Sequence, residues 1–411
     1  MRGAAPKWLW AMLVGVGAAP LQAQPVVGTY YAATGNPEAS AALPAEKLTH
    51  VIYAFATLCG SHPSDTKAAG AARAATCKGR RAHEMTVPRD RKTSAEIAAL
   101  DALRRRNPKL KILASIGGWG MPLYPEMVRT PSSRARFVSS AVRFLRSHPQ
   151  FDGIDIDWEY PGGGDNLRKL LPEVERAAEA PAFDALAQSL RTALDDLGHR
   201  SGRSYQLTAA IAGYPRSVRG VDWKTSQGAF NYLFVMTYDF TPEKSFAVRG
   251  DYSGGGGPPG HHTNLHASAA TDGYGADAMI ETLAGAGVPR AKMVIGAAFY
   301  AREWKDVDWD QGRFPAATPT GTFVDSVPYR VLTARDLSAK GVREGYDTAA
   351  EAAYAVSDGR LLSFDNPRSI CAKGMWARRS GLAGIFAWEA SQDDGSLVTA
   401  MHDSVNGGCK P

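Results

Sequence analysis

The sequence predicts an α/β fold, a TIM (β/α)8 barrel with one small inserted α+β subdomain. Three observations support this prediction: eight short runs rich in β-branched and aromatic residues, helical patterns between most of them, and one long insertion before the last helix. Alternating strands and helices are typical of parallel sheets with crossover helices. Because there are eight strand-like runs, the pattern favours a closed barrel over an open sheet.

The eight predicted strands are Val26 to Tyr31, His50 to Leu58, Leu110 to Ser115, Phe151 to Glu159, Tyr205 to Ile211, Tyr232 to Tyr238, Met293 to Phe299 and Ala383 to Trp388. Helices are expected where apolar residues recur at helical spacing. These segments are Ala95 to Arg105, Ser132 to Ser147, Ala182 to Leu197, Ala276 to Ala286 and Pro367 to Arg379.

The insertion lies between the seventh predicted strand and the last helix and covers residues Trp304 to Asn366. It is far longer than an ordinary connection, so we expect a subdomain of its own. Within it, Gly321 to Val324 and Leu361 to Phe364 are predicted strands, and Tyr329 to Lys340 is a predicted helix.

The first residues have the pattern of a secretory signal peptide. Arg2 and Lys7 precede an apolar run from Trp8 to Ala19, and Leu21 to Ala23 offers a cleavage site. A membrane anchor is the alternative, but a span needs about 20 apolar residues. We therefore expect residues 1–23 to be removed and the mature protein to be secreted, extracellular or periplasmic, with no membrane association after cleavage.

The composition indicates a globular protein, because 44% of the 411 residues are hydrophobic and 21% are charged. The 47 Lys+Arg and 41 Asp+Glu leave a net charge of +6, too small to indicate nucleic-acid binding. The densest basic cluster lacks interleaved aromatic residues and consists of Lys78 to Arg81, Arg89, Arg91 and Lys92. We interpret this cluster as a solvated loop, and we expect a mature chain of residues 24–411 that acts as a monomer.

Four cysteines in an exported chain indicate disulfides, and three pairings are possible. We favour Cys59 with Cys77 and Cys371 with Cys409. A zinc site is disfavoured because the chain has no Cys-x-x-Cys, and the pair His261-His262 is better explained as polar lining of a loop. We expect neither a metal nor an organic cofactor.

The fourth predicted strand carries alternating acids. Because strand side chains alternate between faces, Asp155, Asp157 and Glu159 share one face at spacings of about 6.6 Å. Ile154, Ile156 and Trp158 would face the helices, and Asp152 has the same parity, which gives it a structural role. Three acids would therefore point into the barrel.

Buried acids so close together cannot all ionise, because desolvation and mutual repulsion raise their pKa values. Glu159 comes last on the strand, at the end of a barrel where catalytic groups lie, and is the candidate general acid. Asp157 lies below it on the same strand, so it cannot attack from the opposite side of a glycosidic bond. The spacing suits a nucleophile supplied by the substrate; a structural polar network or a Mg²⁺ or Ca²⁺ site is the alternative.

The segment Asp152 to Glu159 resembles the D-x-x-D-x-D-x-E signature of family 18 chitinases, and Ser115 to Gly118 resembles their S-x-G-G motif. Further similarities cover nearly all of the mature chain and include Met236-Thr237-Tyr238-Asp239, Tyr300-Ala301-Arg302 and Phe386-Ala387-Trp388-Glu389. The insertion resembles the chitin-insertion domain of one bacterial subgroup.

The resemblance implies a secreted chitinase that cleaves β-1,4-linked N-acetylglucosamine with retention of configuration. Glu159 would protonate the leaving oxygen while the substrate's 2-acetamido oxygen attacks, giving an oxazolinium ion. Asp157 would orient that acetamido group, Asp155 would share a proton with Asp157, and Tyr238 would hydrogen-bond the acetamido oxygen.

The other candidate positions fall into two groups. The expected substrate-binding residues are Trp388, Trp119, Asp239, Met236, Tyr300, Arg302, Tyr160, Phe55 and Tyr30, and the expected structural support comes from Ser115, Gly117, Gly118 and Asp152. The alternatives are core packing for the aromatic residues and a rim ion pair for Asp239 and Arg302. For the whole protein, the alternatives are a catalytically weak chitin- or glycan-binding lectin and an endo-β-N-acetylglucosaminidase acting on N-glycans.

Overall fold

The computed structural model describes residues 24–162, 173–218, 220–240, 259–267, 271, 273–308 and 320–409. The predicted signal peptide, residues 1–23, lies outside the described residues. Among the helices of the described part, none is long and apolar enough to cross a membrane.

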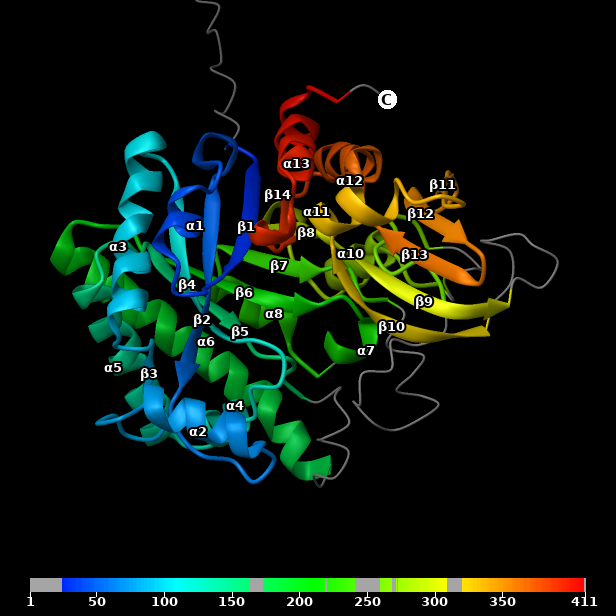
Figure 1. The fold of residues 1–411 in the computed structure, drawn as a ribbon. Helices are drawn as coiled ribbons and strands as arrows, with labels where there is room; N and C mark the ends of the chain where they lie inside the picture. The colour runs from blue at the N-terminus through cyan, green and yellow to red at the C-terminus, as the bar shows by residue number, and fades with distance from the viewer. Residues whose placement is uncertain are drawn as a thin grey trace, which may run out of the picture.

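Eight parallel strands form a closed barrel in the centre of the molecule (Figure 1). Strand β1 pairs with both β14 and β2, which closes the sheet. The order around the barrel confirms all eight predicted strands: β1 (Val26–Ala32), β2 (His50–Leu58), β4 (Lys111–Gly117), β5 (Gly153–Asp157), β6 (Gln206–Ala212), β7 (Tyr232–Met236), β8 (Met293–Ala298) and β14 (Gly384–Trp388). A short strand, β3 (Met85–Thr86), joins β2 in antiparallel orientation.

The five predicted helices are present on the outside of the barrel as α3 (Arg91–Arg106), α5 (Pro131–Ser147), α6 (Glu173–Ser201), α10 (Ala276–Gly285) and α12 (Pro367–Arg379). Local sequence determines where several of these helices begin. Thr130 and Ser133 form a reciprocal capping box at the start of α5, and Asn366 and Ser369 do the same for α12. Each of these helices also has proline at its first position, where no backbone N–H is needed.

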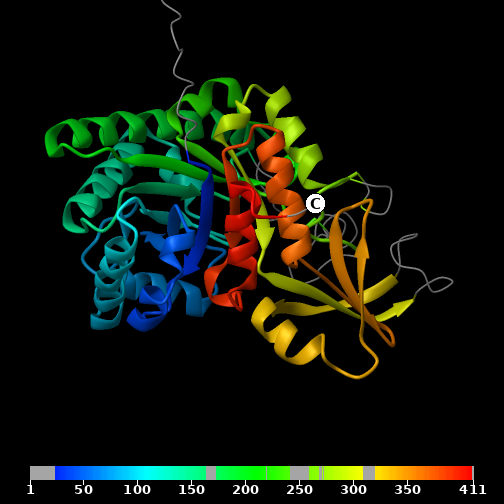
Figure 2. The same ribbon diagram turned by 90° about the horizontal axis from the view of Figure 1, so that it is seen from above.

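Other helices are not among the sequence predictions. The longest are α2 (Lys67–Thr76) and α13 (Ser396–Asn406), and the short ones are α1 (Pro37–Ala41), α4 (Tyr124–Val128), α7 (Pro215–Val218) and α8 (Trp223–Ser226). Helix α13 lies beside α12 in both views (Figure 1 and Figure 2).

A five-stranded antiparallel sheet stands to one side of the barrel (Figure 2). Its strands are β9 (Tyr300–Asp308), β10 (Thr320–Pro328), β11 (Arg343–Asp347), β12 (Ala352–Ser357) and β13 (Arg360–Phe364). The sheet begins at Tyr300, earlier than the expected start at Trp304, because β9 continues almost directly from β8. Trp304 is instead buried in a small core with Val307 and Leu361.

The helix expected at Tyr329 to Lys340 is shorter than predicted. A single turn, α11 (Tyr329–Val331), leads into a π-helical turn over Leu332–Asp336. Both predicted disulfides are confirmed. Cys59 and Cys77 have Cα atoms 5.6 Å apart, and Cys371 and Cys409 have Cα atoms 5.8 Å apart.

Candidate active site

Asp155 on β5 forms the base of an acidic stack inside the barrel. Its Oδ2 accepts hydrogen bonds from Ser115 Oγ on β4 at 2.7 Å and from Tyr30 OH on β1 at 2.9 Å. Its Oδ1 accepts a third, from Thr208 Oγ1 on β6 at 2.6 Å. Strand register explains two of these contacts, since Ser115 and Thr208 are the direct neighbours of Asp155 in β4 and β6. Burial raises the pKa of Asp155 above its ordinary value, and the hydrogen bonds from the three donors oppose this rise.

Asp157 lies above Asp155 and is 3% exposed. Its Oδ1 is buried and has no hydrogen-bond partner within the part of the chain that the structure describes. Burial, and then the charges of Glu159 and Asp155, raise the pKa of Asp157 well above its ordinary value. Glu159 follows the end of β5 and is partly exposed. The stack therefore runs from a hydrogen-bonded carboxylate, through a carboxyl that readily keeps a proton, to an acid at the barrel mouth.

The end of β4 approaches this stack without side chains of its own. Gly117 and Gly118 have φ values of 120° and 85°, a region that favours glycine. A Cβ atom on Gly117 would lie 2.0 Å from the Asp157 carbonyl oxygen, and one on Gly118 would lie 2.5 Å from the Phe55 ring. Gly118 N also donates a 2.9 Å hydrogen bond to that carbonyl. Gly117 is thus required for the close contact between β4 and β5, and Gly118 leaves room for the Phe55 ring on β2.

Aromatic rings gather around Trp388, the last residue of β14. The ring of Phe55 stacks on that of Trp388 with a centroid distance of 5.7 Å and an interplanar angle of 21°. The ring of Tyr30 lies 5.6 Å from Trp388 and is tilted. Trp388 is half-buried, so part of its indole faces the barrel mouth. Trp119 is 58% exposed, which excludes the core-packing alternative for this residue.

A second polar cluster is centred on Asp239, just beyond β7. Arg302 Nε and Tyr300 OH donate hydrogen bonds to its Oδ1 at 2.6 Å and 2.7 Å, and His262 Nδ1 lies 3.4 Å from the same oxygen. Although burial alone would raise it, the positive charge of Arg302 and these hydrogen bonds lower the pKa of Asp239 below its ordinary range. The ion pair considered as an alternative for Asp239 and Arg302 is therefore formed.

Tyr238 precedes Asp239 and is buried, with its ring 6.3 Å from that of Tyr300. Burial and the charge of Asp157 raise the pKa of Tyr238 well above its ordinary value, so its phenol stays protonated and can donate. Asp239 itself adopts φ 62°, an uncommon conformation for a residue other than glycine and one that clusters at functional sites.

The remaining predicted residues lie close to the stack or behind it. Met236, the last residue of β7, and Tyr160, three residues beyond the end of β5, are both buried. Burial and the charge of Glu159 raise the pKa of Tyr160. Asp152 lies on the outer side and pairs with Arg104 at 2.8 Å and Arg203 at 3.2 Å.

Sequence reasoning missed two polar residues of the site. Thr208 interrupts an apolar strand at an inward position, and this parity could have identified it. His262 was interpreted only as polar lining, because nothing local in the sequence indicates that it reaches Asp239. His262 N donates to Ser363 Oγ at 3.1 Å, which fixes the histidine to β13.

No group of three or more His, Cys, Asp or Glu side chains suited to hold a metal ion occurs among the described residues. What the arrangement offers is acid and hydrogen-bond chemistry: one partly exposed carboxyl, one buried carboxyl with an available oxygen, a protonated phenol and an aromatic floor. Such a set can donate a proton and stabilise positive charge that develops nearby.

The family model of glycosyl hydrolases family 18 matches residues 26–393. The chain is 31% identical to chitinase A of Pseudoalteromonas piscicida, over 89% of this chain and 50% of that protein. It is also 31% identical to the probable endochitinase of Orgyia pseudotsugata multicapsid polyhedrosis virus, over 88% of this chain and 68% of that protein. The chain thus spans half the length of the first of these relatives and about two thirds of the second.

A solved structure has the same fold. The family 18 N-acetylglucosaminidase from Paenibacillus barengoltzii superimposes with a TM-score of 0.71 at 28% identity, covering 93% of this chain and all of that chain. Because the family model extends over nearly all of the described barrel and inserted sheet, the chain belongs to family 18 of the glycosyl hydrolases.

Proposed function

We propose that this protein is a secreted chitinase that hydrolyses β-1,4 linkages between N-acetylglucosamine units, with the substrate's own acetamido group as nucleophile. Family membership supports glycoside hydrolysis, and the chitinase names of its relatives support chitin as the substrate. The observation that carries the mechanism is the buried Oδ1 of Asp157, which has no hydrogen-bond partner among the described residues and lies in the acid stack below Glu159.

In the proposed reaction, Glu159 donates its proton to the glycosidic oxygen as the bond to the anomeric carbon breaks. The acetamido oxygen of the same sugar attacks the anomeric carbon and forms an oxazolinium ion. Asp157 accepts a hydrogen bond from the acetamido N–H and stabilises the positive charge, while the Tyr238 phenol donates to the acetamido oxygen. A water molecule then attacks the anomeric carbon and opens the oxazolinium ring, while Glu159 removes a proton from that water. Because the anomeric carbon is displaced twice, its configuration is retained.

The two other carboxylates serve these steps indirectly. Asp155 accepts hydrogen bonds from three hydroxyl donors, and its negative charge, when present, favours a proton on Asp157. Asp239, paired with Arg302, offers a fixed polar contact to a sugar hydroxyl. No metal or organic cofactor is needed, because the carboxylates, Tyr238 and the substrate supply the charge stabilisation.

The aromatic groups supply the sugar-binding surface. Trp388, supported by Phe55, presents an indole face under the sugar whose bond is cleaved, and Trp119 offers a second face to the leaving chain. Secretion is supported by the basic and apolar pattern of residues 1–23 and by the two disulfides, which are typical of exported proteins.

The decisive experiment compares the mature protein with Glu159→Gln on chitohexaose and on its fully deacetylated counterpart, with products followed by mass spectrometry. The wild type should cleave only the acetylated oligomer, and the variant should lose roughly 10²–10⁴-fold in kcat. Glu281→Gln is the matched control, because Glu281 is an exposed acid on α10 that pairs with Arg290. Proton NMR of the first products should show the β-anomer.

Two outcomes would contradict the proposal. Binding of chitohexaose without cleavage by the wild type would indicate a lectin. Release of sugar from an N-glycoprotein without cleavage of chitohexaose would indicate an endo-β-N-acetylglucosaminidase.

A further inference from the structure

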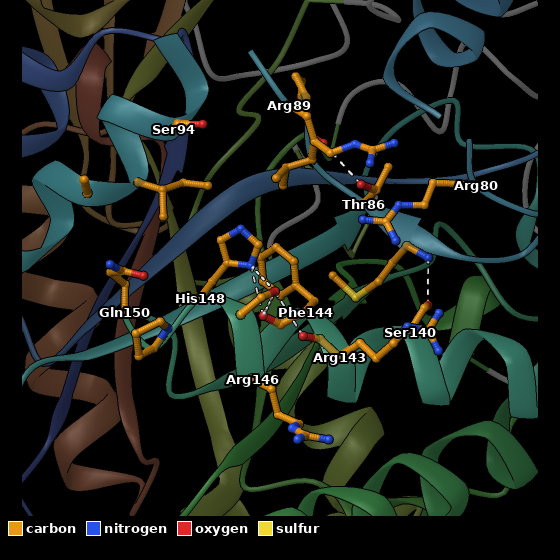
Figure 3. A pocket seen from close by; sticks show the side chains of 17 residues that line it. Arg80, Thr86, Arg89, Ser94, Ser140, Arg143, Phe144, Arg146, His148 and Gln150 are labelled. Atoms are coloured by element: carbon orange, nitrogen blue, oxygen red, sulfur yellow. Dashed lines mark hydrogen bonds between the residues drawn. The ribbon is translucent and has the colours of Figure 1, made fainter. Parts of the chain in front are cut away.

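A groove on the outer side of the barrel encloses about 720 Å³, within the range of small-ligand sites. Its walls are the segment around β3, the first turns of α3, and the second half of α5 with the residues that follow it (Figure 3). None of its lining residues belongs to the candidate active site. The groove is therefore a second concave surface, separate from the acid stack.

The charged side chains that line the groove are all positive. The charged lining residues are Arg80, Arg89, Arg143 and Arg146, and no Asp or Glu is among the 17 residues that line the groove. The chain as a whole is nearly balanced, with 47 Lys+Arg and 41 Asp+Glu. In Figure 3, Arg80 and Arg89 lie on one side of His148, and Arg143 and Arg146 lie on the other. The arrangement concentrates positive charge from two separate chain segments around one space.

Much of this charge is not neutralised by neighbouring acids. Arg80 and Arg146 are exposed and form no ion pair with any residue that the structure describes. Arg89 donates to the carbonyl oxygen of Lys78, which leaves its charge uncompensated. Only Arg143 is paired, with Glu84 at 2.9 Å. Three of the four arginines thus keep their full charge for a ligand.

The walls are fixed before any ligand binds. Met85 N donates a 2.9 Å hydrogen bond to Ser140 Oγ, which ties the β3 segment to α5. The His148 ring stacks on Phe144 at a centroid distance of 4.3 Å. Val87 and Ile97 are buried residues of the lining and give the groove an apolar surface.

We propose that this groove binds an anionic sugar chain, an oligosaccharide carrying sulfate or carboxylate groups, outside the hydrolytic cleft. The planar guanidinium groups match the paired oxygens of sulfate and carboxylate. The apolar surface and the polar edges match the C–H faces and hydroxyl edges of a pyranose ring.

Single-stranded nucleic acid fits the groove less well. Such ligands need exposed aromatic faces on which bases stack. The aromatic rings in this lining are Phe144, which is buried, and His148, which already stacks on it. The basic residues that sequence analysis assigned to a solvated loop thus contribute Arg80 and Arg89 to a sugar-binding surface.

The proposal is tested by calorimetric titration of the mature protein at 50 mM NaCl with three oligomers of similar length. The probes are a heparin-derived octasaccharide for sulfate, an octagalacturonate for carboxylate, and oligo-dT of eight nucleotides. We expect binding of at least one anionic sugar, and we expect the affinity to fall at 500 mM NaCl because salt screens charged contacts. The sugar that binds identifies which anionic group the groove prefers.

The variant Arg80→Ser/Arg146→Ser should weaken sugar binding by roughly tenfold or more, since it removes two charge-assisted contacts. The matched control, Arg200→Ser/Arg379→Ser, removes the same charge from exposed positions on α6 and α12 and should bind as the wild type does. Both variants should keep the wild-type Tm and the wild-type rate on chitohexaose.

Three results would overturn the proposal: no binding of either anionic sugar, equal loss of affinity in both double variants, or tighter binding of oligo-dT than of both sugars. The second result would mean that the loss of affinity reflects the net charge of the protein and not the groove. The third would favour nucleic acid as the ligand. None of these results depends on chitin hydrolysis, so the proposed function can fail or stand independently.

Discussion

The phenol of Tyr30 on β1 donates a 2.9 Å hydrogen bond to Oδ2 of Asp155 on β5, across the interior of the barrel. The two residues are 125 positions apart in the sequence. With Ser115 and Thr208, Tyr30 completes a set of three hydroxyl donors from three strands. This contact connects barrel closure to the electrostatics of the acid stack, because a carboxylate with three donors can remain charged although it is buried.

Tyr30→Phe removes one donor from Asp155 and keeps the aromatic ring. The pKa of Asp155 should rise further, and kcat on chitohexaose should fall by roughly tenfold, since a hydrogen bond to a charged group contributes about 1.5–3 kcal/mol. The measurement is the pH profile of kcat. Tyr53→Phe is the control, because the Tyr53 phenol donates at 2.9 Å to buried Glu96 away from the stack. An unchanged profile for Tyr30→Phe would show that Asp155 does not need this donor.

Asp157→Asn should make the protein more stable at pH 8 and less active. The folded-state pKa of Asp157 is raised by burial and by the charges of Glu159 and Asp155. A raised pKa means that the folded state binds the proton more tightly, so stability is lost as pH rises through that pKa. Asparagine cannot ionise and avoids this loss, so the gain in Tm should be large at pH 8 and small at pH 4.

Asp152→Asn provides the opposite control for that experiment. Asp152 pairs with Arg104 and Arg203, so the same chemical change should lower Tm at pH 8. If Asp157→Asn also lowered Tm at pH 8, the structure would have to stabilise the charged form of Asp157. That result would contradict the effect expected from burial and from the charges of Glu159 and Asp155.

Trp119→Ala should weaken substrate binding without affecting folding. Its indole is 58% exposed, so little buried apolar area is lost. Loss of a stacking face should raise KM for chitohexaose by roughly three- to tenfold, and Tm should not change. In contrast, Trp158→Ala removes a ring that is 1% exposed and stacks on Tyr124 with a centroid distance of 5.3 Å. This change should lower the free energy of unfolding by about 3–5 kcal/mol. An unchanged KM for Trp119→Ala would remove this residue from the proposed sugar-binding surface.

Arg302→Gln should shift the acid limb of the pH profile of kcat/KM to higher pH. Despite burial, the Arg302 guanidinium holds the pKa of Asp239 below its ordinary range. Because the pKa of Asp239 is depressed in the folded state, its carboxylate adds to the free energy of unfolding above the pKa of the unfolded state, about 3.9. This contribution is lost as the pH falls through the pKa of the folded state. Without Arg302, Asp239 takes up its proton at higher pH. Arg360→Gln, which breaks ion pairs with Glu303 and Asp336 in the inserted subdomain, should leave the acid limb unchanged.

Local end signals did not by themselves decide which helices the sequence predicts, because α2 was missed although Thr66 caps it, and α10 was predicted although no side chain caps it. Helix α12 begins at Pro367 after an Asn366 cap, as its local sequence predicts. Helix α13, Ser396–Asn406, is bounded by Gly395 and Gly407 and packs beside α12 and against β14 and β1. The insertion was recognised from its length, but its first strand was missed because only Phe299 separates β9 from β8.

By itself, the sequence determined that Asp155 and Asp157 share one face of a strand below Glu159, because a period of two residues is imposed by backbone geometry. It also indicated the eight strands and the disulfide pairs. Only the tertiary structure decided that Tyr30 reaches Asp155, that His262 and Arg302 meet at Asp239, and that Arg80 and Arg146 line one groove. These contacts join distant segments, so they depend on how the barrel closes and how its helices pack, which no local pattern encodes.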